Sequence, residues 1–356
     1  MASKHGTQTA GSQAQEPSAL PQQRSIGLSD CPARAERSNK ATIAKAQLHA
    51  VGSIADISAN WSAKVVVASN EQADRTKMAA VYDSMAATFL KDGLNLAAIA
   101  AIRQFYGRID AQPEPLFYEH FPTPLQQGAV RLVVFQPVQA DPLIQLAQSA
   151  CQDVLGSLPP GMQPHASLPS SFHLTIFMTS QPGDPRPDPF TPGGGIDATH
   201  PPVPIPAASA ATLQHEVDTF RQIALTARPA FEVRHCLSAT ETVLQVHSVV
   251  FANSGTVLLC LVDTTSQLPS MRQRISKSFP GASSKQSSIM HMTLGRVLQP
   301  RQLQDSERQA VQQQCNQWSS KLKGHLFNPD TLWHIQEHQF TTVAGVQTPL
   351  PLASIA

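Results

Sequence analysis

The pattern of apolar and polar positions predicts a mixed α+β chain in which one order of elements occurs twice. Each copy begins with an apolar, β-type strand, continues with a helix that a proline opens, and ends with a second strand. In the first copy these elements lie at 131–135, from Pro142 to Gly156 with Asp141 as its cap, and at 172–177. In the second copy they lie at 256–262, from Pro269 to Phe279, and at 289–294. This recurrence predicts two pseudo-equivalent lobes.

The stretches between and after the two copies complete the predicted domain. Residues 181–206 hold nine Pro and four Gly and are expected to form a loop between the lobes. A polar helix at 302–323 and strand-like runs near 325–327 and 332–344 follow the second copy. The two-lobed domain is therefore predicted to cover 115–350.

The N-terminal part of the chain differs in composition from the lobes. Residues 1–70 are rich in Ala, Ser and Gln and contain no apolar segment of the kind that a secretory signal requires. We expect a disordered tail in a cytoplasmic protein or, alternatively, a transit peptide to a plastid or mitochondrion. Between 74 and 109 apolar positions recur at helical spacing with a break at Gly93, which predicts a helical hairpin within an extension over 71–112.

Charge and hydropathy narrow the classes of ligand. The 26 Lys and Arg residues against 25 Asp and Glu residues give a net charge of +1, which excludes a broadly basic surface that coats nucleic acid. Phosphate recognition must therefore be local. The longest uncharged apolar stretch, 242–262, contains polar residues and a glycine turn signal, so it predicts two strands rather than a membrane span. We expect a monomer without a membrane partner.

Positive residues gather in one segment of this otherwise balanced chain. Between 264 and 304 there are six basic residues and no acidic one: Arg272, Arg274, Lys277, Lys285, Arg296 and Arg301. The segment is expected to form an electropositive rim of a phosphate site or, alternatively, an exposed basic helix face without a ligand.

The second strand of each copy carries a His-x-Thr motif, His173 with Thr175 and His291 with Thr293. Residues i and i+2 of a strand point to one face, so each histidine projects together with its threonine. A single such pair is usually a satisfied core pair, but matched positions in a repeat favour a site. Across a cleft, one neutral imidazole would deprotonate water, the other would protonate a leaving oxygen, and the hydroxyls would bind phosphoryl oxygens. Such a pair predicts a bell-shaped pH profile around neutrality.

The motifs resemble those of the two-histidine (2H) phosphoesterase superfamily, which includes the bacterial 2′-5′ RNA ligase and cyclic phosphodiesterase proteins. The resemblance rests on Arg131-Leu-Val-Val-Phe135, Phe172-His-Leu-Thr-Ile-Phe177 and His291-Met-Thr-Leu-Gly-Arg296, and it covers 115–350. It implies a bilobal fold with antiparallel sheets flanking a central cleft, and opening of 2′,3′-cyclic phosphates or related RNA-end chemistry without a metal. The two histidines are 118 positions apart, longer than is usual for the family, and the loop at 181–206 accounts for part of the excess.

Two residues near the motifs have expected orientations. Arg296 follows His291 by five positions, so a regular strand would place it on the opposite face, in a structural role. Phe177 would share the face of His173, where it would either pack in the core or stack on a base.

Other candidate sites fail on their context. His334 and His338 have the spacing of a helix-borne metal pair, but the residues around them are typical of a strand. The five cysteines form no CxxC pair and predict neither a disulfide framework nor a thiolate zinc site.

The sequence therefore predicts a metal-independent phosphodiesterase, without a cofactor, that acts on a 2′,3′-cyclic phosphate or a related nucleotide or RNA end. His173 and His291 are the expected acid–base pair, and Thr175 and Thr293 the expected phosphate ligands. Two alternatives stay open. One is a module that binds a nucleotide or RNA end without turnover, and the other is a scaffold whose surface binds a protein partner.

Overall fold

The computed structural model describes residues 74–108, 112–138, 141–196, 205–226, 244–265 and 267–352. The leader predicted over 1–70 lies outside the described residues, as do Cys31 and Cys236. The three described cysteines, Cys151, Cys260 and Cys315, are free and buried.

Nine strands of the described chain form one antiparallel sheet in the order β11-β10-β3-β5-β8-β7-β6-β9, with β4 paired to β8. They are β3 (Val130–Phe135), β4 (Pro164–Ala166), β5 (Leu174–Ser180), β6 (Leu244–Phe251), β7 (Thr256–Asp263), β8 (His291–Val297), β9 (Leu326–Phe327), β10 (Thr331–Glu337) and β11 (Gly345–Pro351). A small second sheet joins β1 (Tyr106–Gly107) to β2 (Glu114–Pro115). The predicted strands are confirmed, except that the run expected at 332–344 is the β10 strand and the turn that leads to β11.

The sheet consists of two halves that meet at one residue pair. β5 pairs with β8 only through Leu174 and Met292. The β5 half therefore runs β5-β3-β10-β11 and the β8 half runs β8-β7-β6-β9. In each half the His-x-Thr strand lies beside the first strand of its own copy, so the predicted pair of pseudo-equivalent lobes is confirmed.

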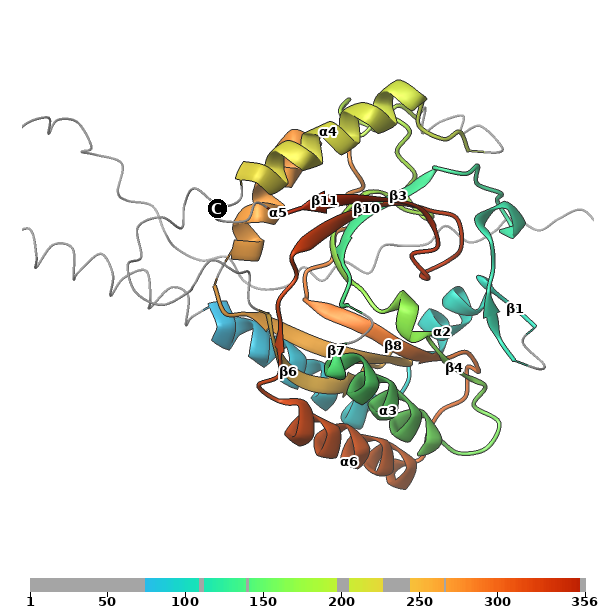
Figure 1. Cartoon of the computed structure of the whole chain (residues 1–356). Helices are drawn as coiled ribbons and strands as arrows, with labels where there is room; N and C mark the ends of the chain where they lie inside the picture. Colours follow the sequence, from blue (N-terminus) through green and yellow to red (C-terminus); the bar gives the residue numbers. More distant parts are fainter. Residues whose placement is uncertain are drawn as a thin grey trace, which may run out of the picture. The chain divides into compact units, whose positions relative to one another are not determined.

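The helices are exchanged between the two halves. The described helices are the helix at Asp74–Asp92, α2 (Leu96–Arg103), α3 (Pro142–Gly156), α4 (Ala210–Thr226), α5 (Gln267–Ser278) and α6 (Asp305–Leu322), with short 3-10 turns η1 (Tyr118–His120) and η2 (Pro169–Ser171). α3 follows β3 in the chain but packs with α6 on the β8 half, whereas α5 follows β7 and packs with α4 on the β5 half. Figure 1 shows the two curved sheet layers with one helix pair outside each.

α3 begins and packs as its sequence predicts. The Asp141 side chain accepts a hydrogen bond from the Leu143 N–H at 2.8 Å, and Pro142 fills a first-turn position that needs no donor. Leu143, Ala147 and Val154 lie on the buried face toward the core. The spacing of these apolar residues fixes which side of the helix meets the sheet.

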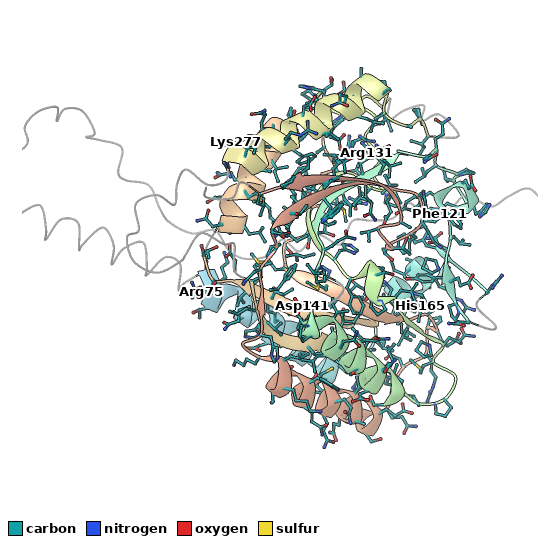
Figure 2. The ribbon with its side chains drawn as sticks, viewed as in Figure 1. Arg75, Phe121, Arg131, Asp141, His165 and Lys277 are labelled. Carbon is teal, nitrogen blue, oxygen red and sulfur yellow. The ribbon has the colours of Figure 1, made fainter. Side chains whose placement is uncertain are left out.

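α4 was not predicted, although Val217, Phe220 and Ala224 have helical spacing and are buried, and a buried charge cluster lies on the same face. Glu216 is fully buried in α4, and its Oε2 lies 2.9 Å from Nε of the buried Arg131 on β3. Its Oε1 accepts a hydrogen bond from Thr179 and lies 3.0 Å from Nε2 of His334. Figure 2 marks Arg131 beneath α4. A helix whose inward face includes a carboxylate does not show a purely apolar stripe.

The two N-terminal helices are present, but they meet at 104° rather than lying antiparallel as a hairpin. Gly93 has φ of +70°, and Asn95 caps α2 by accepting from the Ala98 N–H at 3.0 Å. No single described helix is long and apolar enough to cross a membrane; this bent pair meets the criteria of length and composition only when its two members are combined.

Candidate functional site

The two His-x-Thr motifs lie side by side at the junction of the sheet halves. The joining pair, Leu174 with Met292, consists of the middle residue of each motif. By antiparallel geometry the positions that flank this single pair are His173 beside Thr293 and Thr175 beside His291, although the ladder itself does not continue past the pair. Both middle residues are buried in the core, so the four motif side chains project from the opposite face. The two histidines are diagonal neighbours, whose Cβ atoms lie about 7–8 Å apart or less in such a ladder.

A β-bulge follows each motif at the same position. The register of β5 against β3 skips Ile176, and the register of β8 against β7 skips Leu294. Each skipped residue is the third after the motif histidine. A bulge shifts the alternation of faces by one position, so residues beyond it point opposite to the direction that a regular strand gives them.

The bulge in β8 brings Arg296 to the face of the motif side chains. Arg296 pairs with Thr256 in register, and its Nη1 donates to Thr256 Oγ1 at 3.2 Å. The expectation that Arg296 lies on the opposite face is therefore wrong. The missed signal is Gly295, because a glycine within a strand often marks a bulge. A Cβ there would lie 2.9 Å from Cys151 Sγ and from the His165 carbonyl oxygen.

The bulge in β5 has the reverse effect on Phe177. Its side chain is 4% exposed and lies in the main core, with its ring centroid 6.3 Å from that of Phe279. The expectation that Phe177 shares the face of His173 is wrong for the same reason, and Phe177 packs in the core.

β4 lengthens the row of polar side chains. It pairs with β8 beyond the motif, where His165 lies opposite Arg296. The His165 Nδ1 donates to the Pro113 carbonyl at 2.9 Å, and the ring meets Tyr106 edge-on at 5.1 Å. The row thus consists of His291, Thr293 and Arg296 on β8, and of His165 on β4 with His173 and Thr175 at the start of β5. No motif in the sequence points to His165, since it lies outside both His-x-Thr segments.

The ring orientation of the motif histidines follows from their backbone. The His173 Nδ1 lies 2.7 Å from the carbonyl oxygen of Ser171, two positions earlier, so Nδ1 carries the proton. The carbonyl of Ile289, also two positions earlier, acts on His291 in the same way, although the geometry at its buried Nδ1 falls short of a hydrogen bond. In His173 the free Nε2 is then the proton acceptor.

Burial and positive neighbours keep both rings neutral. Burial lowers the pKa of His173, the Ser171 carbonyl raises it, and Arg296 lowers it further. The pKa of His291 falls to about 4, first through burial and then through Arg296, His173 and Arg272, while the Ile289 carbonyl opposes the shift. Removing charged imidazolium from water costs free energy, and a nearby guanidinium adds to that cost.

Two members of the basic segment border the site, and neither lies on a free basic face. Besides Arg296, these include Arg272 of α5, which donates to the carbonyls of Thr175 and Ile176 at 2.9 and 3.0 Å. Those carbonyls are free because β5 leaves β8 after the joining pair. Arg301 lies away from the motifs in an ion pair with Glu307 at 3.1 Å. Arg296 and Arg272 are thus the two members of the basic segment that act on the motif histidines.

The helix at 74–92 bounds the site on the β7 side. Tyr82 is fully buried and packs with Leu258 and Cys260, which are the β7 partners of Thr293 and His291. Its hydroxyl oxygen lies 2.7 and 2.9 Å from the Leu261 and Met290 carbonyl oxygens, which share its one proton, and it accepts from the Met290 N–H at 3.1 Å. The predicted extension therefore covers the β6 and β7 part of the face that carries the motifs.

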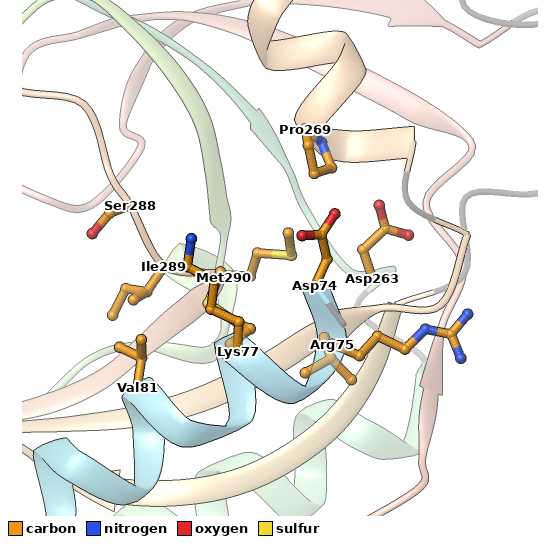
Figure 3. Close-up of a pocket in the computed structure, with 11 residues that line it drawn as sticks. Asp74, Arg75, Lys77, Val81, Asp263, Pro269, Ser288, Ile289 and Met290 are labelled. Carbon is orange, nitrogen blue, oxygen red and sulfur yellow. The ribbon is translucent and has the colours of Figure 1, made fainter. Parts of the chain in front are cut away.

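A cavity of about 380 Å³ lies between this helix, the end of β7 and the start of α5 (Figure 3). Most of its walls are apolar, with Met78, Val81, Pro269 and Met290 among them. The Asp263 carboxylate at its edge is engaged in starting α5, because it accepts a hydrogen bond from the Leu268 N–H at 2.7 Å. None of the residues that line this cavity belongs to the polar row.

The other histidines proposed from sequence do not form a metal pair. His334 in β10 is buried against Glu216 of α4. The centroid of the His338 ring lies 5.6 Å from that of Phe117. Within the described ranges, no group of three or more His, Cys, Asp or Glu side chains is placed to hold a metal ion.

Comparison with known proteins gives only distant similarity. No protein-family model matches the chain, and no curated protein matches it. Among solved structures, a conserved protein of unknown function from Agrobacterium tumefaciens is similar at 12% identity and a TM-score of 0.37, over 67% of this chain and 94% of that one. Usb1 from Kluyveromyces marxianus is similar at 11% identity and a TM-score of 0.34, over 64% of this chain and 99% of that one. The chemistry of the site has to be inferred from its own residues.

Proposed function

We propose that the protein is a metal-independent phosphodiesterase that opens a 2′,3′-cyclic phosphate or cleaves a related nucleotide or RNA end. One observation carries the proposal: Leu174 and Met292, the middle residues of the two motifs, pair at the junction, and Arg296 follows farther along β8. We call the four motif side chains, His173, Thr175, His291 and Thr293, the His-x-Thr square. A phosphate bound over this square meets two ring nitrogens, two hydroxyls and the guanidinium of Arg296. These groups match the needs of phosphoryl transfer, in which positioning and charge stabilisation dominate.

The reaction requires one proton acceptor and one proton donor on opposite sides of phosphorus. One neutral imidazole takes a proton from water, whose oxygen then attacks phosphorus. The bond between phosphorus and the leaving ribose oxygen breaks, and the second ring, as imidazolium, donates its proton to that oxygen. Thr175, Thr293 and Arg296 stabilise the negative charge on the phosphoryl oxygens. After the step the base holds the proton taken from water and the acid has lost its proton. Exchange of one proton with solvent at each ring restores the starting state.

We assign His291 as the base and His173 as the acid. Two arginines and the other histidine oppose protonation of His291, whereas Arg296 is the charged group that acts against protonation of His173. The ring that stays neutral most readily suits the base. A bound phosphate anion offsets the guanidinium charge, so substrate binding favours the imidazolium form that the acid needs.

The experiment is hydrolysis of 2′,3′-cyclic nucleotides by the full chain and by His173→Ala and His291→Ala. General acid–base catalysis contributes about a hundredfold to ten-thousandfold, so each variant should lose activity by that factor. His120→Ala is the matched control, since His120 has a mainly exposed side chain outside the polar row.

Three results separate the possibilities. Activity that depends on both motif histidines and survives in the control supports the proposal. A wild-type chain that binds the nucleotide without turnover supports the binding module instead. The neutral state of both motif histidines in the free protein fits that alternative. Activity that a chelator abolishes and a divalent metal restores contradicts the metal-independent mechanism.

A further inference from the structure

We propose that a neutral polar cavity beside His165 binds the base and sugar of the nucleotide whose phosphate lies over the His-x-Thr square. This inference rests on the proposed function and deepens it, because it names the part of the chain that recognises the nucleoside of the substrate. It also assigns specificity to residues that lie outside both motifs.

The cavity has a volume of about 410 Å³, within the range of about 300–1,000 Å³ that small-molecule sites occupy. Three separate segments form its walls: 112–115 at β2, 165–171 between β4 and β5, and 339–344 at the turn from β10 to β11. Cross-links hold these segments together, since Gln339 Nε2 donates to the Pro115 carbonyl at 2.9 Å. Figure 2 marks His165 on the β4 side of the molecule.

Two contacts tie the cavity to the phosphate square. Ser171 lines the cavity, and its carbonyl accepts the hydrogen bond that orients His173. His165 also lines it and is the cross-strand partner of Arg296, which is the guanidinium at the end of the row. Since the helix at 74–92 covers the β7 side of the face, the β4 side remains for the rest of a substrate.

The chemistry of the walls selects the kind of group. The lining residues include hydroxyl and amide side chains, namely Gln112, Ser167, Ser170, Gln339, Thr341 and Thr342, but no Lys or Arg. The one carboxylate, Glu114, is paired with Arg108 at 3.1 Å, so the lining residues offer no free positive charge to a second phosphate. Hydroxyl and amide groups both donate and accept, as the edges of a base and the hydroxyls of a sugar require.

An exposed leucine supplies an apolar surface for a base. Leu168 in the β4–β5 connection is 70% exposed, the largest exposed fraction among the large hydrophobic residues of the described chain. It lines the cavity, so it offers an apolar surface against which the face of a base can pack. Thr341 and Val343 in the facing turn have φ of +54° and +53°, a conformation that costs free energy and is found most often near ligand sites.

The test compares two substrates with the same reacting ring. One is a 2′,3′-cyclic nucleotide, and the other is glycerol 1,2-cyclic phosphate, which has no base and no ribose. We expect the wild-type chain to prefer the nucleotide, measured as the ratio of the two kcat/KM values. Leu168→Ser and His165→Gln should each lower this ratio about tenfold, because each removes part of the surface that only the nucleoside reaches.

Leu326→Ser is the matched control, because Leu326 is also an exposed leucine but lies on β9, outside the cavity. It should leave the ratio unchanged. If the wild type turns over both substrates with equal kcat/KM, or if Leu168→Ser and His165→Gln both leave the ratio unchanged, the cavity does not bind the nucleoside and this inference is wrong. The proposed function survives that result, whereas failure to hydrolyse either substrate contradicts the proposed function itself.

Discussion

The two His-x-Thr motifs occupy equivalent positions and share a bulge, yet the bulge presents a different side chain in each. Five positions after the histidine, β8 has Arg296 and β5 has Met178. Met178 pairs with Leu132, and its backbone is held by the side-chain amide of Gln286, which accepts from its N–H at 2.9 Å and donates to its carbonyl at 2.8 Å. One copy therefore offers a charge to the site and the other an apolar side chain.

This difference shows how a repeated order of strands can hold two catalytic side chains in unequal surroundings. The strand pairing gives the two histidines similar positions, each near the carbonyl two positions earlier, although only His173 meets the geometry of a hydrogen bond. Arg296 lowers the pKa of both rings, and Arg272 from α5 lowers that of His291 in addition, which makes their electrostatic surroundings unequal. A symmetrical pair of rings could exchange the roles of acid and base, whereas an unequal pair is biased toward one assignment.

The largest expected effect tests that assignment directly. On a 4-nitrophenyl phosphodiester of a nucleoside, the leaving group departs as a stable anion and needs no acid. His173→Ala should then recover most of the loss of about a hundredfold or more that it shows on cyclic nucleotides, whereas His291→Ala should remain inactive. The measurement is kcat/KM on both substrates. Recovery of His291→Ala instead would reverse the two roles.

The next effect concerns the outer helices of the two halves. α4 is tied to the β5 half by the buried Glu216, and α6 is tied to the β8 half by Ser319, whose hydroxyl accepts from the Val249 N–H at 2.9 Å. Glu216→Ala leaves Arg131 buried without its partner, so we expect it to lower the free energy of unfolding by about 3–5 kcal/mol. Ser319→Ala should cost about 1 kcal/mol. Urea unfolding followed by circular dichroism measures both, and equal costs would show that the two anchors are equivalent.

Replacing Arg296 by the residue of the other copy breaks the asymmetry of the motifs. Arg296→Met removes a charge that stabilises the transition state, and kcat/KM should fall by about a hundredfold. Met178→Leu is the paired control in β5 and should alter kcat/KM by less than about threefold, since the two side chains have similar volume. A small effect of Arg296→Met would show that Arg296 does not contact the phosphate.

The smallest effect is a shift in the pH profile of kcat/KM. Its acid limb should report the neutral form of His291, whose pKa is about 4, and its alkaline limb the protonated form of His173, whose pKa lies below the ordinary 6.5. The optimum is therefore expected on the acidic side of neutrality, rather than around it. Arg272 acts on His291, so Arg272→Gln removes a positive charge, raises the pKa of His291 and moves the acid limb to higher pH. An unmoved acid limb, or an equal shift of both limbs, would assign that limb to another group.

Sequence patterns predict the strands and the repeated order because these depend on local periodicity. The faces of residues beyond the motifs were wrong for Arg296 and Phe177, since one skipped residue in a register reverses every later position. Such a skip is set by the pairing with the neighbouring strand, which the local periodicity of one strand does not describe. α4 was missed although Val217, Phe220 and Ala224 have helical spacing, whereas the contacts of Glu216 to Arg131 and His334 are tertiary and do not follow from that pattern. His165 joins the row only through pairing between distant segments.

The exchange of helices between the sheet halves makes each half dependent on the other. If the chain were severed between β5 and α4, the N-terminal fragment would keep α3 but lose the strands β7 and β8 that α3 covers. The C-terminal fragment would keep α5 and lose β5, to which Arg272 is bound. Each piece would leave apolar surface uncovered, so the repeated units amount to one cooperative folding unit. The junction at Leu174 and Met292 then lies within a single domain. Two such fragments are expected to fold when they are mixed and not when each is alone.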